Sequence, residues 1–460
     1  MSRRFRISSA GAVLAAVAPL SLMAASSGVA VGALASTGGA APLSRLVSQH
    51  AFATPPTTAL CEAAFGIACY SPSQFQTAYD LGPLYAHGLT GKGTTIAVVD
   101  AFGDPNAAAN LAVFDKAFSL PAPPSFKVIQ PAGPVPTFNP NDPTMANWAF
   151  ETNLDVQYAH AIAPGAKILL VETPVAETEG VTGFPEIVKA ENYVVAHHLA
   201  DVISQSFSAT EQTFPTAQSL LGLRSAYKAA AQTGITVLAG SGDSGATNST
   251  LSGASLYLHR AVGWPASDPL VTAVGGLQYF LDANGNQTQP AAVWNDTSLL
   301  GSPAAGGGGR STIFNRPSYQ NSVANRVGTQ RGVPDISLSA AVNGGAIVYV
   351  TASVLVPSAG FYVVGGTSEA SPEFAGVVAI ADQAAHHDLG LINPALYALN
   401  AQHAAGIVDI TAGTNTVTFS QNGTNHTVLG FDARVGYDLA SGVGGIDAAT
   451  FVPELVAASQ

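Results

Sequence analysis

The sequence predicts an α/β domain with a mostly parallel central sheet covered by helices on both faces. Three observations predict this class: continuous apolar runs typical of buried strands, helical patterns between several of them, and Gly and Pro without a fixed period. The chain has 460 residues, 47% of them hydrophobic and 10% charged, which is enough for one large domain or two smaller ones. This composition excludes collagen and a mostly disordered chain.

The first residues predict export. Three arginines, Arg3, Arg4 and Arg6, precede an apolar run from Ala10 to about Ala35. Proline, serine and glycine interrupt this run, which favours a removable signal peptide over residues 1–35. The alternative is a membrane anchor. No later segment stays apolar for the ~20 residues of a membrane span, so we expect a secreted, extracellular protein with no stable span after signal removal.

A short segment, residues 36–74, is expected between the signal and the main domain. Its first part is rich in Ser, Thr, Ala, Gly and Pro, as in a linker, and its second part holds the only two cysteines, Cys61 and Cys69. Export favours a disulfide between them, which would close a small loop. The main domain is then expected over residues 75–455.

Strands and helices are expected to alternate along the main domain. A helix is expected over 71–87, followed by a strand over 95–100 and a helix over 106–118. Further strands are expected over 167–171, 202–206, 236–239 and 270–274, and helices over 148–160, 185–198 and 217–234. Such alternation implies right-handed crossovers and a parallel sheet.

The strongest candidate for a nucleophile is Ser368. It follows Gly365-Gly366-Thr367 and precedes a helical run through Ala385, with Pro372 in or near the first turn. A hydroxyl there lies near unpaired backbone N–H groups and the positive end of the helix dipole, which can help to hold an oxyanion. The alternative is an N-capping serine in a glycine-rich turn.

Carboxylates supply the candidate proton-handling groups. Glu151 and Asp155 are four residues apart on an expected helix, so they share one face, and their neighbours in the sequence are mostly apolar. A lone pair of this kind is usually a solvated acidic face, but burial among apolar residues favours a role in proton transfer. Asp243 follows an expected strand within Ser241-Gly242-Asp243. It is either a turn-stabilising residue or a side chain projecting into a site at the carboxyl end of the sheet.

Charge and histidine placement exclude other chemistries. The net charge is −12 with only 17 Lys and Arg, so we expect no nucleic-acid partner. An acidic, lysine-poor surface suits an acidic medium. The one competing His-Gly pair, His87-Gly88, precedes the first core strand, and His160, His197 and His198 are expected to be packing or surface residues.

These motifs together resemble the sedolisins, or serine-carboxyl peptidases, a family that includes kumamolisin-like enzymes. The resemblance extends in order over roughly residues 75–450. Besides the segments around Glu151, Asp243 and Ser368, it includes Ile96 to Gly103, Trp264 to Asp268, Val274-Gly275-Gly276, Arg331 to Ile336, Asp409 to Asn415, and Gly436 to Gly444. The resemblance implies a subtilisin-like three-layer fold, protein or peptide substrates and, we expect, a monomer.

The resemblance also implies a role for each candidate residue. Ser368 would attack the scissile carbonyl, Glu151 would be the general base, and Asp155 would orient Glu151. Asp243 would donate to the oxyanion, which requires it to be protonated and implies acidic operation. One structural calcium ion is implied as well, held by the carboxylates of Asp409 and Asp438 and by three backbone carbonyls: Ile410, Arg434 and Gly436.

Several alternatives stay open at this point. The chain is expected to be an endopeptidase, but a tripeptidyl-aminopeptidase and a non-catalytic secreted binding protein fit the same motifs. Glu369 and Glu373 are unusual acidic additions beside the nucleophile. Many family members carry a long propeptide, whereas only a short segment precedes the catalytic region here, so the means of keeping the enzyme latent is open.

Overall fold

The computed structural model describes residues 44–460, so the expected signal peptide lies outside the described residues. The main sheet has eight strands, and every pair in it is parallel except β10–β11. Its order is β11 (Gln287–Val293), β10 (Thr272–Leu281), β8 (Thr236–Gly240), β6 (Val202–Gln205), β3 (Thr95–Ala101), β5 (Lys167–Thr173) and β4 (Phe126–Ile129), with β14 (Ile336–Ser339) also pairing with β10. The mostly parallel sheet predicted from the apolar runs is confirmed.

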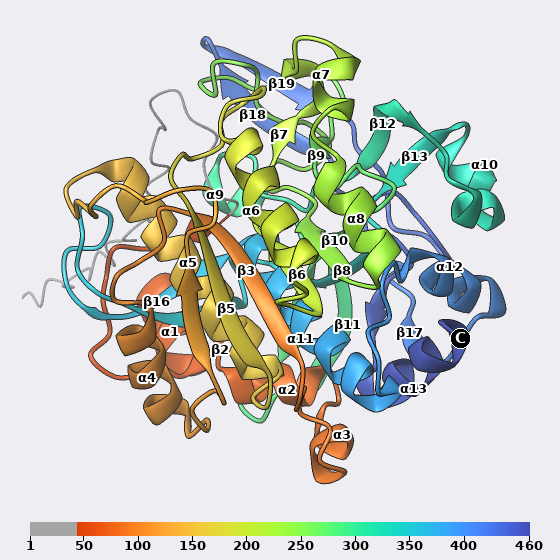
Figure 1. The fold of residues 1–460 in the computed structure, drawn as a ribbon. Coiled ribbons are helices and arrows are strands. Elements are labelled where there is room, and N and C mark those ends of the chain that lie inside the picture. The colour runs from red at the N-terminus through yellow and green to blue at the C-terminus, as the bar shows by residue number, and fades with distance from the viewer. Residues whose placement is uncertain (1–43) are drawn as a thin grey trace, which may run out of the picture.

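Helices cover both faces of this sheet (Figure 1). On β3, Ile96 and Val98 pack with residues of α5 (Pro143–Ile162) and α11 (Thr367–Ala385), whereas Ala97 and Val99 pack on the other face with α6 (Phe184–Ala196) and α8 (Ser225–Thr233). Both sets are buried, as expected for a parallel strand covered on each side. The three-layer α/β class is therefore confirmed.

Two expected helices are divided in the structure. The pattern over 71–87 forms α2 (Pro72–Ala78) and α3 (Gly82–Ala86), separated by Asp80, which has a positive φ of 54°. The pattern over 217–234 forms α7 (Ala217–Leu221) and α8, which follow one another across Gly222. In both places the apolar spacing continues across a turn, so periodicity alone could not reveal the break.

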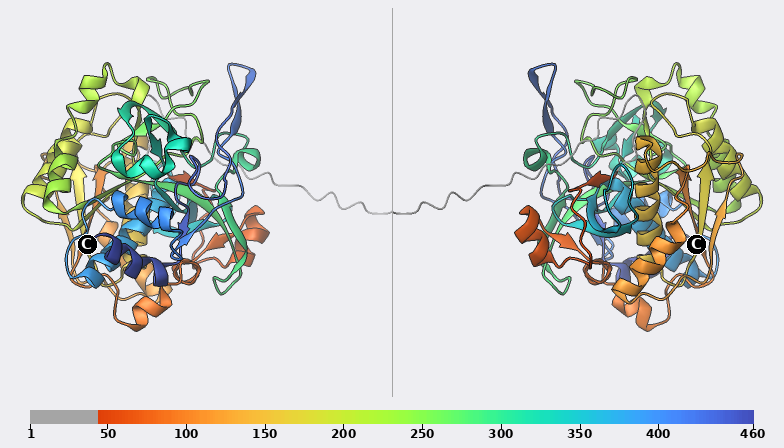
Figure 2. Two further views of the ribbon diagram at one scale, coloured as in Figure 1. Left: turned by 90° about the vertical axis from the view of Figure 1, so that its right-hand side faces the viewer. Right: turned by 90° about the vertical axis from the view of Figure 1, so that its left-hand side faces the viewer.

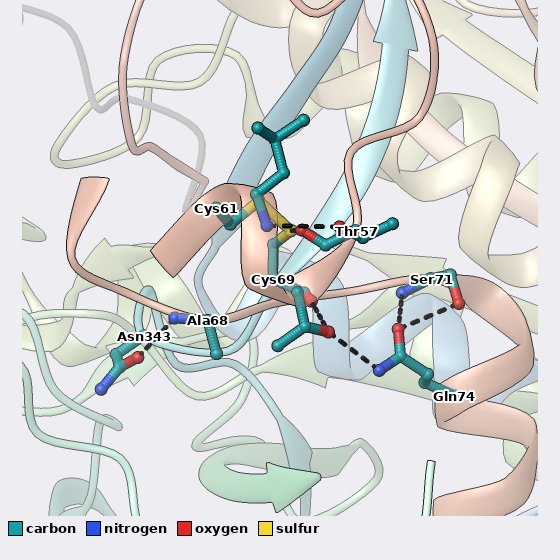
Figure 3. Close-up of a disulfide and its surroundings, with 9 residues drawn as sticks. Thr57, Cys61, Ala68, Cys69, Ser71, Gln74 and Asn343 are labelled. Carbon is teal, nitrogen blue, oxygen red and sulfur yellow. Dashed lines mark hydrogen bonds between the residues drawn. A yellow bond between two sulfur atoms is a disulfide. The ribbon is translucent and has the colours of Figure 1, made fainter. Parts of the chain in front are cut away.

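A second sheet ties the N-terminal segment to the main body. Its order is β1 (Arg45–Leu46), β16 (Gly360–Gly365), β15 (Gly345–Val350) and β2 (Cys69–Tyr70). The predicted disulfide between Cys61 and Cys69 is present and joins α1 (Thr58–Phe65) to β2 (Figure 3). Nearby, the Ala68 amide donates to Asn343 Oδ1 at 3.0 Å, as Figure 3 also shows. Residues 44–74 therefore contain paired strands as well as connecting segments.

The remaining elements are short or peripheral. The helices are α4 (Ala107–Phe118), α9 (Thr297–Leu300), α10 (Ala324–Val327), α12 (Asn393–Gln402) and α13 (Ala448–Ala458), with 3-10 turns at Glu211–Thr213 and Ser318–Val323. The strand pairs are β7 (Ala209–Thr210) with β9 (Gly263–Trp264), β12 (Gly309–Asn315) with β13 (Gln330–Val333), β17 (Ile407–Val408) with β20 (Gly445–Ile446), and β18 (Val417–Gln421) with β19 (Thr424–Val428). Figure 2 shows the β18–β19 hairpin extending from the body. Within residues 44–460, no helix combines the length and apolar character needed to cross a bilayer.

Candidate active site

Helix α5 carries the first two candidate residues. It begins with Pro143 after Asp142, whose carboxylate accepts from the amides of Thr144 and Met145 and so caps the helix. Glu151 and Asp155 lie one turn apart in its middle, and both are fully buried. The sequence-based expectation of a buried carboxylate pair on one helix face is confirmed.

Helix α11 carries Ser368 and packs closely against α5. Gly376 makes this approach possible, because a Cβ there would lie only 2.7 Å from the Ile162 side chain of α5. Ser368 is the second residue of α11, after Gly366, which has a φ of 125° that favours glycine. Its hydroxyl is buried and has no hydrogen-bond partner among the described residues. This free hydroxyl argues against the alternative of an N-capping serine.

Ser368 and Glu151 face each other across the two helices. Burial raises the pKa of the Glu151 carboxyl well above its usual range. The Ser368 hydroxyl lies near enough to Glu151 to oppose this shift, but its effect is smaller than that of burial. Within the described chain, neither Glu151 oxygen completes a hydrogen bond in this state. The Ser368 hydroxyl and the Glu151 carboxyl are therefore neighbours that can form a hydrogen bond. Catalytic groups often complete such a bond only when substrate is bound.

Asp155 is held by the neighbouring strand end. Its Oδ1 accepts from the Ser206 hydroxyl at 2.8 Å, just after β6. Burial raises the pKa of Asp155, and the nearby carboxylates of Asp100 and Glu151 raise it further. Like charges oppose each other's ionisation, so the Glu151 carboxylate makes Asp155 harder to ionise.

Asp243 approaches the same site from the end of β8. Its Oδ1 accepts from the Thr367 amide at 2.8 Å and from the Thr367 hydroxyl at 2.9 Å, so it lies beside the residue that precedes Ser368. Burial raises the pKa of Asp243 to about 6, with Arg45 and the Thr367 hydrogen bonds opposing this shift. Its Oδ2 makes no hydrogen bond within residues 44–460.

The structure thus brings all four candidate residues to one place. Three groups around them were not singled out as site residues from the sequence: Asp100, Ser206 and Thr367. Asp100 lies near the carboxyl end of β3, and burial raises its pKa to about 7. Ser206 follows the next strand of the sheet in the same way. Position at the carboxyl end of a parallel strand was the signal for both residues.

The N-terminal strap, which we define as residues 44–47, lies across this site. Its β1 residues pair with β16, the strand that leads into Ser368, with Arg45 opposite Gly365. The Arg45 guanidinium donates to the Asp243 carbonyl at 3.2 Å and lies 3.8 Å from Asp243 Oδ2. Ser44 lies near enough to Glu151 to lower its pKa. No local sequence pattern identifies these contacts, because they depend on strand pairing between distant segments.

The histidines lie elsewhere. His160 is buried, but its Nε2 lies 2.7 Å from the carbonyl of Pro121 and 3.4 Å from Asp115, away from Ser368. His87 ends α3, and His197 is exposed at the end of α6. No described histidine hydrogen-bonds to any of the four candidate residues, so the charged groups grouped around Ser368 are carboxylates together with Arg45.

The five predicted calcium ligands come together near the C-terminal end. Both oxygens of Asp409 accept from the Gly436 amide at 3.1 Å, and Asp438 Oδ2 accepts from the Arg434 amide at 2.9 Å. Within residues 44–460, the backbone carbonyls of Ile410, Arg434 and Gly436 accept no hydrogen bond from protein donors. Two carboxylates and three free carbonyls form an all-oxygen donor set, which fits calcium.

Comparisons with known proteins agree with this geometry. The profile of the Subtilase family matches residues 141–437. Kumamolisin from Bacillus sp. (strain MN-32) is 32% identical over 382 residues, which cover 82% of this chain and 61% of kumamolisin. Tripeptidyl-peptidase 1 from Homo sapiens is 28% identical over 308 residues, which cover 64% of this chain and 49% of that protein. The chain thus spans about half to three-fifths of the length of these curated relatives.

A solved structure extends the comparison to the fold. Pseudomonas sedolisin, described as a serine-carboxyl proteinase in complex with two molecules of pseudo-iodotyrostatin, superposes with a TM-score of 0.69 at 26% sequence identity. The match covers 86% of this chain and all of that one. Together with the ordered motifs and the buried carboxylates around Ser368, these matches show that the chain belongs to the subtilase family and, within it, to the sedolisins, the serine-carboxyl peptidases.

Proposed function

We propose that this chain is a secreted, acid-acting serine-carboxyl endopeptidase with Ser368 as its nucleophile. The observation that carries the proposal is the unpartnered, buried hydroxyl of Ser368 beside the Glu151 carboxylate. A hydroxyl becomes an effective nucleophile when an adjacent base can take its proton. Family membership supports the reaction class, and the geometry supports the assignment of roles.

The reaction follows from these positions. Ser368 Oγ attacks the peptide carbonyl carbon while its proton passes to Glu151, and Asp155 holds Glu151 in place. Protonated Asp243 donates from Oδ2 to the oxyanion. The tetrahedral intermediate collapses, the C–N bond breaks, and Glu151 returns the proton to the leaving amine. Water then attacks the acyl-enzyme by the same steps, which releases the acid and restores Ser368.

Cleavage-product mapping across pH tests this function. Asp243 must be protonated to donate, whereas Glu151 must be ionised to accept the serine proton. Burial raises the pKa of Asp243 to about 6, so activity should fall as pH rises through that value, and it should fall again in strong acid as Glu151 becomes protonated. Mass spectrometry of peptide digests between pH 3 and about 8 would show this. Turnover that is higher at pH 8 than at pH 4 would contradict the assignment of Asp243.

The same digests distinguish the alternatives. Internal cuts in long peptides indicate endopeptidase action, whereas successive release of tripeptides from free N-termini indicates the exopeptidase alternative, which the similarity to tripeptidyl-peptidases favours. If no cleavage occurs at any pH, even after the strap is removed, the chain is a non-catalytic binding protein of the same fold.

We propose that the strap keeps the enzyme latent. Arg45 lies beside Asp243 Oδ2, the oxygen assigned to the oxyanion, so a substrate carbonyl cannot approach while the strap is paired to β16. Proteolytic removal of residues up to Val47 is expected to raise peptidase activity at least about 10-fold. The strap competes with substrate for the site, and each ~1.4 kcal/mol by which its contacts favour the closed site lowers activity by a factor of 10.

An assay of matched chains with and without the strap measures this effect. Arg45→Gln in the intact chain should also raise activity, because it removes the contact to Asp243. Arg260→Gln is the control, since Arg260 likewise donates to backbone carbonyls, those of Leu429 and Gly430, but away from the site. An intact chain that is as active as the trimmed one would contradict the proposed latency.

We further propose one structural calcium ion on the carboxylates of Asp409 and Asp438. When bound, it would neutralise these carboxylates and fix the loop that carries residues 434–438 to Asp409. Chelation at neutral pH is expected to lower Tm, because a ligand that binds only the folded state stabilises it. Differential scanning calorimetry of the natural chain and of Asp409→Asn provides the measurement. An identical Tm with calcium and with chelator would contradict the site.

A further inference from the structure

A histidine and two aspartates cluster at the opposite edge of the main sheet from the candidate active site. His198 follows α6, Asp201 precedes β6, and Asp388 lies in the loop after α11. His198 Nε2 is 2.9 Å from Asp388 Oδ2 and 4.0 Å from Asp201 Oδ1. Together, one ligand atom from each of these three residues lies within 4.8 Å of the others. Three protein ligands at this spacing can converge on one ion.

The carboxylates of this cluster are held in place by the backbone. Asp201 Oδ2 accepts from the Thr95 amide at 2.6 Å, which leaves Oδ1 directed towards His198. The chain directly after Asp388 is fixed by two hydrogen bonds: the Leu389 amide donates to Asp382 Oδ1 at 2.9 Å, and the Thr236 hydroxyl donates to the Gly390 carbonyl at 2.6 Å. Such outer hydrogen bonds orient metal ligands in known sites.

Asp382 provides an independent indication of a ligand. It is only 2% exposed, and its Oδ2 has no hydrogen-bond partner in the described chain. It lines the same surface pocket as Asp201 and Asp388. An unpartnered buried carboxyl is costly in its charged form, so it either takes up a proton or meets a nearby positive charge.

The described protein groups supply little of that positive charge. Three carboxylates meet one imidazole, His198, and Lys92, which also lines the pocket, makes no ion pair within residues 44–460. The other titratable groups at the pocket are His386 and His387, both in the loop after α11. The cluster therefore has an excess of acceptors and negative charge that a cation would neutralise.

We propose that this cluster binds one divalent transition-metal ion, Zn²⁺, through His198 Nε2, Asp201 Oδ1 and Asp388 Oδ2. Mixed imidazole and carboxylate ligands suit zinc, whereas calcium takes oxygen ligands alone. The site is distinct from the all-oxygen set around Asp409. It lies near Asp382, about 21 Å along α11 from Ser368, so its role is structural: it ties α6, β6 and the end of the nucleophile helix together.

Calorimetric titration with ZnCl₂ tests this site directly. The protein is first treated with chelator, then exchanged into buffer with calcium present, at pH 7.5, where an unperturbed imidazole is mostly neutral. We expect one Zn²⁺ per chain from this site and a rise in Tm of about 2–4 °C at a hundredfold excess over Kd. Substitution by Co²⁺ should give the absorption of a low-coordinate ion bound by nitrogen and oxygen.

Variants separate this site from other histidines. His198→Gln and Asp388→Asn should each weaken Zn²⁺ binding at least about 10-fold and remove the Tm shift. His197→Gln is the matched control, because His197 is the adjacent exposed histidine and its ring contacts Tyr193 instead. Stoichiometric binding that survives in both cluster variants, or no Zn²⁺ binding in the natural chain, would overturn the proposal. Calorimetry without metal confirms that each variant is folded.

Discussion

Ser368→Ala is expected to lower kcat on a peptide substrate by at least about 10⁴-fold, because the acyl-enzyme can no longer form. The Ser368 hydroxyl makes no hydrogen bond among the described residues, so its removal leaves no new unpaired group, and the fold should keep its stability. Steady-state kinetics on trimmed protein at pH 4 and thermal unfolding of the same samples measure both effects.

Ser371→Ala provides the matched control for Ser368. Ser371 is another buried serine of α11, but its hydroxyl bonds to Ser204 at 3.1 Å and to none of the four candidate residues. Its loss is expected to cost about 1 kcal/mol of stability and to leave kcat within a few-fold. If Ser368→Ala retained the activity of Ser371→Ala, Ser368 could not be the nucleophile.

Glu151→Gln should produce a loss similar to that of Ser368→Ala, since the amide keeps the shape but cannot accept the serine proton. Glu191→Gln is its control, because Glu191 on α6 is equally buried and also lacks a hydrogen-bond partner within the described chain. The double variant Ser368→Ala/Glu151→Gln should be no less active than either single variant, since groups that act as a unit are not additive.

The sequence was most informative where periodicity and chemistry coincide. Glu151 and Asp155 share one helix face among apolar neighbours, and the helix and its burial follow from that pattern, whereas the resemblance to the sedolisins implied that Ser368 would lie beside them. Asp243 could likewise be placed at a strand end, because parallel strands present their carboxyl ends along one edge. These features are local, so a single sequence is enough to find them.

The missed features depend on contacts between distant segments. Arg45 lies within a stretch of linker composition, and only its pairing with β16 brings it to Asp243. His198 was expected to be a packing or surface residue, and its neighbour Asp388 is far along the chain. No pattern within a short window reports such proximity, because it is created by the order of strands in the sheet.

Two further buried carboxyls on α11 should make the protein less stable at neutral pH than in acid. Glu369 and Glu373 are fully buried, and burial raises the pKa of each well above 4.5. Glu373 accepts from the Tyr79 hydroxyl at 2.5 Å, whereas neither Glu369 oxygen has a hydrogen-bond partner in residues 44–460. Near neutral pH the fold therefore retains protons that the unfolded chain has released.

The free energy of unfolding should therefore be highest below about pH 4.5 and fall as the pH rises towards 7, by about 1.4 kcal/mol per pH unit for each carboxyl that stays protonated. Glu369→Gln keeps a neutral polar side chain at every pH, so it should flatten this profile. Between pH 4 and pH 7, the free energy of unfolding of this variant should fall by about 1–3 kcal/mol less than that of the natural chain.

Denaturant unfolding of the Ser368→Ala protein at both pH values measures this difference without self-digestion. Glu62→Gln serves as the control, because Glu62 is an exposed glutamate on α1 whose replacement removes a charge but no buried carboxyl. If Glu369→Gln and Glu62→Gln changed the pH profile equally, net charge rather than burial would be responsible. A distinct effect of Glu369→Gln would show that a carboxyl beside the nucleophile couples the stability of this helix to an acidic medium.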